Sequence, residues 1–221
     1  MGLQEYVHDM ESCCRCNACK FIPLEKITGY EHAECCPAIS YHDFHAYSGA
    51  GRMGFGIALA RGRVDYTPAV ADVVYNCTLC GACDVSCKYA MDMDVLEPLL
   101  AVRRECVQNG LTVPVWDELV ESMRRQGPAV TGITGKRGEW YQDLEVKDYT
   151  KEKVAVVYHA GCLANYDQAS GRVARAAVSL LRKAGVDVGI AKEQESCCGG
   201  RVYEMGYEDE ARAQAELQVE R

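Results

Sequence analysis

The chain has 221 residues, which is enough for one large domain or two modest ones, and its hydrophobic content of 48% is ordinary for a globular protein. The net charge of −8 argues against binding to nucleic acid or to an anionic membrane, and no apolar run is long enough to span a bilayer. The first residues lack the basic region and apolar core of a signal peptide, so we expect a cytoplasmic protein.

The cysteine content, fourteen residues, is the most informative part of the composition. A disulfide framework is typical of short secreted chains with a higher cysteine density. Zinc usually takes Cys-x-x-Cys in separated pairs, whereas three or four cysteines in one continuous run are typical of iron–sulfur clusters. The composition therefore favours iron–sulfur ligation over a disulfide framework or a zinc scaffold.

In chain order, a polar lead-in over residues 1–12 ends at the first run, Cys13-Cys14-Arg15-Cys16-Asn17-Ala18-Cys19. A compact ferredoxin motif would have a fourth cysteine soon after Cys19, but the next pair is Cys35-Cys36. Pro37 follows this pair, and a cysteine before proline is the usual fourth ligand because proline turns the chain away. We therefore prefer Cys36 as the ligand, with Cys35 as the alternative.

A glycine-rich stretch follows, in which Gly49, Gly51 and Gly54 spell G-x-G-x-x-G. A dinucleotide-binding loop with this pattern needs a buried strand before it, and residues 41–45 are not an apolar strand. We therefore interpret the glycines as a turn that leads into a helix over 57–62.

The second run is Cys77-Thr78-Leu79-Cys80-Gly81-Ala82-Cys83-Asp84-Val85-Ser86-Cys87. A helix over 66–76 leads into it, and further helices are expected over 94–108 and 114–126. Cysteines at spacings of three, three and four are what a cubane cluster takes from one loop. Cys106 lies on the apolar face of its helix and is interpreted as a buried hydrophobic residue.

Cys36 and Cys87 complete two sets of four cysteines. In two-cluster ferredoxins the fourth cysteine of each run ligates the other cluster. This rule predicts two 4Fe–4S clusters, one held by Cys13, Cys16, Cys19 and Cys87 and the other by Cys77, Cys80, Cys83 and Cys36. The long helical segment between the runs favours an all-α, helical ferredoxin-like domain over residues 1–126.

Residues 127–153 are rich in glycine, charge and threonine, and we interpret them as a linker. Residues 154–158 then form an apolar run bounded by charge, which predicts a buried strand. A helix over 167–184, with Val173 and Leu180 on its apolar face, and a second strand over 186–190 predict a right-handed βαβ unit.

Three more cysteines belong to this half of the chain. Cys162 comes just after the first strand, and Cys197-Cys198 come after the second. Because parallel strands place their carboxyl ends at one edge of a sheet, all three should meet there. We therefore predict a multidomain protein whose second part, residues 154–221, is an α/β domain with a parallel sheet and a candidate third metal site.

The two cysteine runs, followed by Gly161-Cys162 and Cys197-Cys198-Gly199-Gly200, resemble the heterodisulfide reductase group, in which a helical ferredoxin domain precedes a domain with the CCG motif. The iron–sulfur subunits of anaerobic glycerol-3-phosphate dehydrogenase and of lactate-oxidation complexes are similar. Lys88, where proline is common, departs from the pattern. More narrowly, the stretch from Cys35 through residues 48–53 resembles the corresponding subunit of the tungsten-dependent (class II) benzoyl-CoA reductase complex of anaerobic bacteria.

The resemblance implies an electron-transfer subunit without a catalytic site of its own. It would relay electrons through two clusters between a flavin-containing subunit and other iron–sulfur subunits of an oxidoreductase complex. The alternative is a thiol–disulfide reductase subunit with a third, non-cubane cluster at the CCG domain. In the family the pattern continues to a further Cys-x-x-Cys, so we expect this chain to be the first part of a longer protein.

Overall fold

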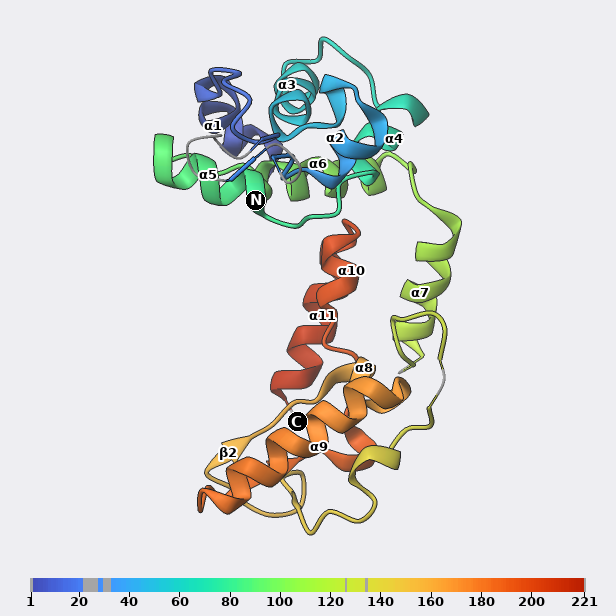
Figure 1. The fold of residues 1–221 in the computed structure, drawn as a ribbon. Helices are drawn as coiled ribbons and strands as arrows, with labels where there is room; N and C mark the ends of the chain where they lie inside the picture. The colour runs from blue at the N-terminus through green and yellow to red at the C-terminus, as the bar shows by residue number, and fades with distance from the viewer. Residues whose placement is uncertain (1, 22–27, 30–32, 126, 134, 221) are drawn as a thin grey trace. The chain divides into compact units, whose positions relative to one another are not determined.

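The computed structural model describes residues 2–21, 28–29, 33–125, 127–133 and 135–220 (Figure 1). Two compact units account for them, and each is described by itself. The first consists of Met1–Val113 with Glu204–Tyr207, and the second of Pro114–Tyr203 with Glu208–Arg221. The boundaries expected from the sequence, at 126 and 153, stay a prediction. In the described part of the chain, no helix has the length and apolar character needed to cross a bilayer.

The first unit is built from helices, as the sequence predicts. They are η1 (Leu3–Tyr6), α1 (Val7–Ser12), α2 (Pro37–His42), η3 (His45–Tyr47), α3 (Gly49–Ala60), α4 (Pro68–Tyr75), α5 (Ala82–Met91) and α6 (Leu96–Gln108). The helix α4 starts where expected, because the Thr67 hydroxyl accepts a hydrogen bond from the amide of Val70 and Pro68 occupies the first turn.

The core of the first unit surrounds α6, which packs against η1, α3 and α4 (Figure 1). Met10, Met53, Val74 and Val102 are among its fully buried side chains. Cys106 lies with them, fully buried, as its place on the apolar face of the helix indicates. The two cysteine runs lie beside this core. The first run follows α1, and the second begins before α5 and continues into it.

The expectation of a glycine-rich turn before residue 57 is wrong, because α3 already begins at Gly49. The glycines are needed for close packing instead. A Cβ on Gly51 would overlap the carbonyl oxygen of His45, and one on Gly49 would lie 3.0 Å from the Cβ of Cys83. The side chain of Ser48 caps the helix by accepting a hydrogen bond from the Gly51 amide.

We expect Gly51→Ala to lower the free energy of unfolding by about 1–3 kcal/mol, because its methyl group would overlap the backbone of η3. Gly54→Ala is the matched control in the same helix. Its Cβ would meet only Arg15 Nη2, at 3.6 Å, so the better helix propensity of alanine should raise stability by about 0.5–1 kcal/mol. Urea unfolding followed by circular dichroism measures both changes, and equal effects at the two positions would refute this account.

The second unit combines helices with a small sheet. Its elements are α7 (Pro114–Arg124), η4 (Glu139–Tyr141), β1 (Lys147–Asp148), β2 (Val156–Val157), α8 (Gly161–Tyr166), α9 (Gln168–Lys183), β3 (Val188–Ile190), η5 (Lys192–Gln194) and α11 (Glu208–Val219). The short α10 (Gly200–Glu204) precedes α11. The three strands are parallel in the order β1-β3-β2, and the pairing of β2 with β3 across α8 and α9 confirms the predicted βαβ unit. The expectation that its first strand is buried is wrong, because β2 is an edge strand in which Val156 and Val157 are 41% and 54% exposed.

The buried face of α9 differs from the predicted one. Val173 and Leu180 are 69% and 66% exposed, whereas Gly171, Ala174 and Val178 face the core. These three positions also follow helical spacing, and their small size lets α9 approach its neighbours closely. A Cβ on Gly171 would lie 3.2 Å from the Cβ of Trp140.

The segment interpreted as a linker contributes to this unit. It contains η4 and β1, and the side chains of Trp140, Tyr141 and Val146 are buried in the core beside α9 and β3. The indole nitrogen of Trp140 donates a hydrogen bond to the amide oxygen of Asn165 in α8, at 3.3 Å. These aromatic residues therefore fix the position of α8, which carries Cys162.

Candidate metal centres

The two cysteine loops repeat the same unusual backbone conformation. In the first, the residues on both sides of Cys16 lie in the left-handed region, with φ of 61° before it and 71° after it. In the second, the same holds around Cys80, with φ of 53° at Leu79 and 77° at Gly81. The left-handed region is costly for a residue such as leucine and persists only where the surroundings require it. Both loops are therefore shaped to turn a central cysteine toward one point.

The four cysteines of one predicted set line a single small cavity in the first unit. They are Cys36, Cys77, Cys80 and Cys83, and Cys19 and Arg52 also line it. Burial raises the pKa of Cys83 to about 12, and the charges of Cys77, Cys19, Cys80 and Cys36 act in the same direction. Thiolates crowded in this way repel one another, so a cationic iron core would relieve the repulsion and release their protons.

The other predicted set includes Cys87, in α5. Burial raises the pKa of Cys87 to about 11, and the charges of Cys19, Cys13 and Cys16 act in the same direction. Cys83 lies one helical turn before Cys87, so one cysteine of each predicted set is on α5. The division of the ligands between two clusters stays a prediction, and Cys19 also lines the cavity of the other set.

In the described residues, no group of three or more histidine, cysteine, aspartate or glutamate side chains is arranged to hold one metal ion. A cubane offers a separate iron atom to each of its four thiolates, so its ligands stand farther apart than those of one tetrahedral zinc ion. The donor set around the cavity, cysteine thiols alone, is the one that iron–sulfur clusters take.

The geometry favours Cys36 over the alternative, Cys35. The residue Cys36 lines the cavity, and its thiol lies 3.9 Å from the carbonyl oxygen of Tyr47. The thiol of Cys35 lies 4.0 Å from the carbonyl oxygen of Ala18. Cys35 is not among the described residues that line the cavity. Cys36 is also the residue before α2, where Pro37 starts the helix.

The candidate third site lies in the second unit. Cys162 is in the first turn of α8, directly after β2, and Cys197 and Cys198 follow η5. Hydrogen bonding with Cys197 lowers the pKa of Cys162 to about 7, and burial partly opposes this. Hydrogen bonding with Cys197 raises the pKa of Cys198 to about 11. The structure therefore brings the three thiols together at the edge of the sheet.

Two further residues, which the sequence did not indicate, lie next to this site. His159 is hydrogen-bonded to Cys198, which raises the pKa of the imidazole. The buried carboxylate of Glu195 accepts hydrogen bonds from the amides of Ala160 and Gly161, at 3.2 and 2.8 Å, at the start of α8. Both residues adjoin the carboxyl ends of strands, so their position at the sheet edge was the signal that could have identified them.

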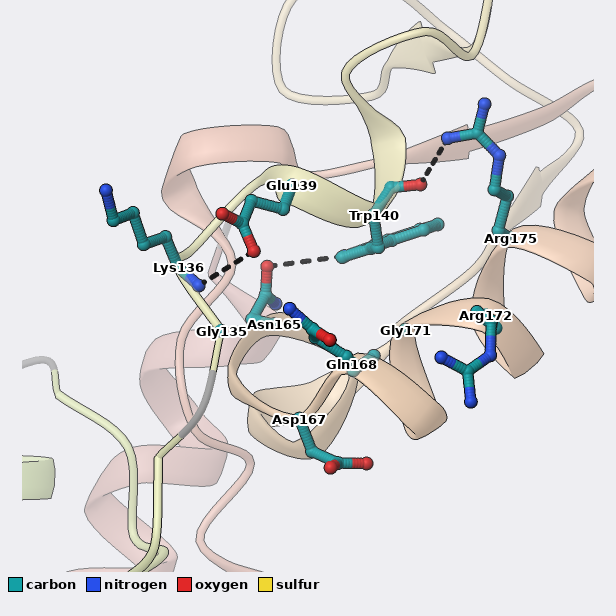
Figure 2. Close-up of a pocket in the computed structure, with 11 residues that line it drawn as sticks. Gly135, Lys136, Glu139, Trp140, Asn165, Asp167, Gln168, Gly171, Arg172 and Arg175 are labelled. Carbon is teal, nitrogen blue, oxygen red and sulfur yellow. Dashed lines mark hydrogen bonds between the residues drawn. The ribbon is translucent and has the colours of Figure 1, made fainter.

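A separate cavity of about 280 Å³ lies between η4 and the start of α9 (Figure 2). Figure 2 shows Trp140 in its middle, with Arg172 and Arg175 on α9 and Lys136 on the opposite side. None of the predicted ligands lines this cavity. Asn165 connects the two sites, because its amide lines the cavity and donates a hydrogen bond to Glu195, at 3.1 Å.

Together, the paired cysteine sets and the thiols at the sheet edge define an iron–sulfur protein with a second, cysteine-rich domain. Residues 156–221 match the family described as the cysteine-rich domain, CCG. The chain is 28% identical over 156 residues to a subunit of the dihydromethanophenazine:CoB–CoM heterodisulfide reductase of Methanosarcina barkeri. The chain is therefore similar to iron–sulfur proteins of the heterodisulfide reductase type, as the motifs indicate. The narrower resemblance to the benzoyl-CoA reductase complex stays a prediction.

Two further relatives agree with this assignment. The EtfAB:quinone oxidoreductase of Syntrophomonas wolfei is 26% identical over 151 residues, and an uncharacterised iron–sulfur protein of Methanococcus maripaludis is 26% identical over 136 residues. The matches cover 65%, 67% and 62% of this chain for the Syntrophomonas, M. barkeri and Methanococcus proteins, but only 21%, 36% and 26% of those relatives. The chain therefore spans about a third or less of their length. No solved structure is significantly similar.

Proposed function

We propose that the chain relays single electrons through two 4Fe–4S clusters within a larger cytoplasmic oxidoreductase complex that contains a flavoprotein. The observation that supports this proposal is the grouping of Cys36, Cys77, Cys80 and Cys83 around one cavity, with Cys87 one helical turn after Cys83. The relatives are named as oxidoreductases, and one name pairs EtfAB, a flavoprotein, with quinone. The ligands proposed for the two clusters are the sets given above.

The residues of the chain would hold the clusters and tune them, while the clusters supply the one-electron chemistry. Backbone amides donate hydrogen bonds to two of the thiols, from Ala50 to Cys19 and from Leu79 to Cys77, each at 3.4 Å. Such bonds favour the more negative, reduced form of a cluster and so raise its potential. Because Cys83 and Cys87 are one turn apart, about 6 Å along the helix axis, the clusters would be close enough for direct electron transfer.

The test is anaerobic purification of the chain with iron and sulfide analysis. We expect a brown protein with about eight irons that is reduced and reoxidised reversibly. About twelve irons would show that the site at Cys162, Cys197 and Cys198 is also loaded. A colourless protein with zinc instead of iron would overturn the proposal.

The second candidate, a thiol–disulfide reductase, is favoured by one observation, the meeting of Cys162, Cys197 and Cys198 with a lowered pKa at Cys162. A reductase should turn over a disulfide substrate when given electrons by reduced methyl viologen. A relay should only pass electrons to a partner protein. The reductase hypothesis would replace the relay hypothesis if the wild type turns over the disulfide and Cys197→Ala does not. The variant must retain the iron of the first unit for this comparison to hold.

A further inference from the structure

Arg52, in α3, is a buried cation whose hydrogen bonds are incomplete. The side chain is only 2% exposed. Its Nε donates a hydrogen bond to the carbonyl oxygen of Val73, at 2.8 Å, and its Nη1 donates to that of Tyr47. Its Nη2 is buried and has no hydrogen-bond partner in the described part of the chain. Burying a guanidinium in this way is costly unless a negative charge lies nearby.

The nearby groups that can carry negative charge are thiols. Arg52 lines the same cavity as Cys36, Cys77, Cys80 and Cys83, which Cys19 also lines, and it forms no ion pair with a carboxylate among the described residues. A buried positive charge beside thiolates is favourable to both, because each offsets the desolvation cost of the other.

A second buried arginine supports the same cysteine loop. Arg103, in α6, donates hydrogen bonds from Nη2 to the carbonyl oxygens of Cys77 and Val74, the latter at 3.4 Å. Burial lowers the pKa of Arg103, and the charge of Cys77 opposes this shift. Of the two buried arginines among the first unit's described residues, Arg52 therefore lines the cavity, and Arg103 contacts the backbone of Cys77.

The buried charge next to the other cysteine set has the opposite sign. Asp84 is buried in α5, and its Oδ1 accepts hydrogen bonds from the amides of Val95 and Leu96, at 2.8 and 2.9 Å. Its Oδ2 forms an ion pair with Lys88, at 3.1 Å.

We propose that Arg52 is the countercharge of the cluster bound by Cys36, Cys77, Cys80 and Cys83 and makes it the higher-potential cluster of the two. This inference rests on the proposed function. When that cluster accepts one electron from a low-potential iron–sulfur or flavin donor, its charge becomes more negative by one, and no bond is made or broken. Arg52 would stabilise the added charge, because it is buried in the lining of the cavity that holds the ligands of this cluster. An electron shared between the two clusters therefore resides on the one beside Arg52.

The test compares Arg52→Gln with Arg52→Lys in redox titrations monitored by electron paramagnetic resonance, with iron counted in parallel. We expect Arg52→Gln to decrease the equilibrium constant for reduction of this cluster at least tenfold, a shift of about 59 mV for one electron. Arg52→Lys keeps the charge and should retain most of the wild-type potential. The control is Arg63→Gln, which removes the same charge from an exposed position where water and salt screen it, and it should shift the potential much less.

An unchanged potential in an Arg52→Gln protein with full iron would overturn the inference. If this variant loses its iron, the order of reduction in the wild type decides. The signal that appears first on reduction should then be missing from Cys80→Ala, and its persistence would refute the inference. Failure of the proposed function is a different result, namely a wild-type protein that contains no iron.

Discussion

A Cys80→Ala variant is expected to retain about four of about eight irons, because alanine cannot replace the central thiolate of the second loop. Cys80 lies between two residues held in the left-handed region, and this geometry turns its thiol toward the cavity of Cys36, Cys77 and Cys83. Iron and sulfide analysis of the anaerobically purified protein measures the loss.

The matched control is Cys14→Ala. Cys14 is an exposed cysteine within the first run and belongs to neither predicted set. Its removal should leave all of the iron in place, so the pair of variants separates ligation from a general sensitivity to losing a cysteine. Full iron in Cys80→Ala would refute the assignment of the second loop.

The helical unit and the cysteine sets could be predicted because their signals are local. Ligand spacing, the Cys36-Pro37 step and the proline at the start of α4 each act within a few residues. The rule that the fourth cysteine belongs to the other run was enough to group Cys87 with the first loop. This grouping of ligands stays a prediction.

The misplaced features depend on contacts between distant segments. The start of α3 is set by how closely Gly51 approaches the backbone of η3, which no local pattern reveals. The apolar pattern predicts Val173 and Leu180 on the buried face of α9, but Trp140 selects the small residues around Gly171 instead. The role of Trp140 is hidden in the sequence because its segment has no periodicity and resembles a linker.

The functional groups that the sequence did not indicate are those whose partner lies elsewhere in the chain. Arg52 is one basic residue in a glycine-rich stretch, and only the fold shows it buried beside four cysteines. Nothing in the sequence distinguishes His159 or Glu195. In the fold, His159 follows β2 and lies next to Cys198, and Glu195 follows β3 and lies at the start of α8. Charge compensation at a buried site therefore has to be read from packing rather than from motifs.

The proposal that Cys87 ligates the cluster of the first loop, and not that of its own loop, makes the sharpest prediction about the iron content. Cys87→Ala alone should retain about four irons, as Cys80→Ala does, but the two variants should lose different clusters. The double variant Cys80→Ala/Cys87→Ala should therefore retain almost no iron. This follows from the grouping of Cys87 with Cys13, Cys16 and Cys19 rather than with its own loop.

A self-contained second loop predicts another outcome for the same double variant. If Cys77, Cys80, Cys83 and Cys87 held one cluster together, both substitutions would damage that cluster only, and about four irons would remain. Cys36→Ala gives the complementary measurement, because combining it with Cys80→Ala should remove no more iron than Cys80→Ala alone. About four irons in the first double variant would disprove the exchange of ligands. Almost none, together with about four in the second, would establish that each cluster draws its ligands from both runs.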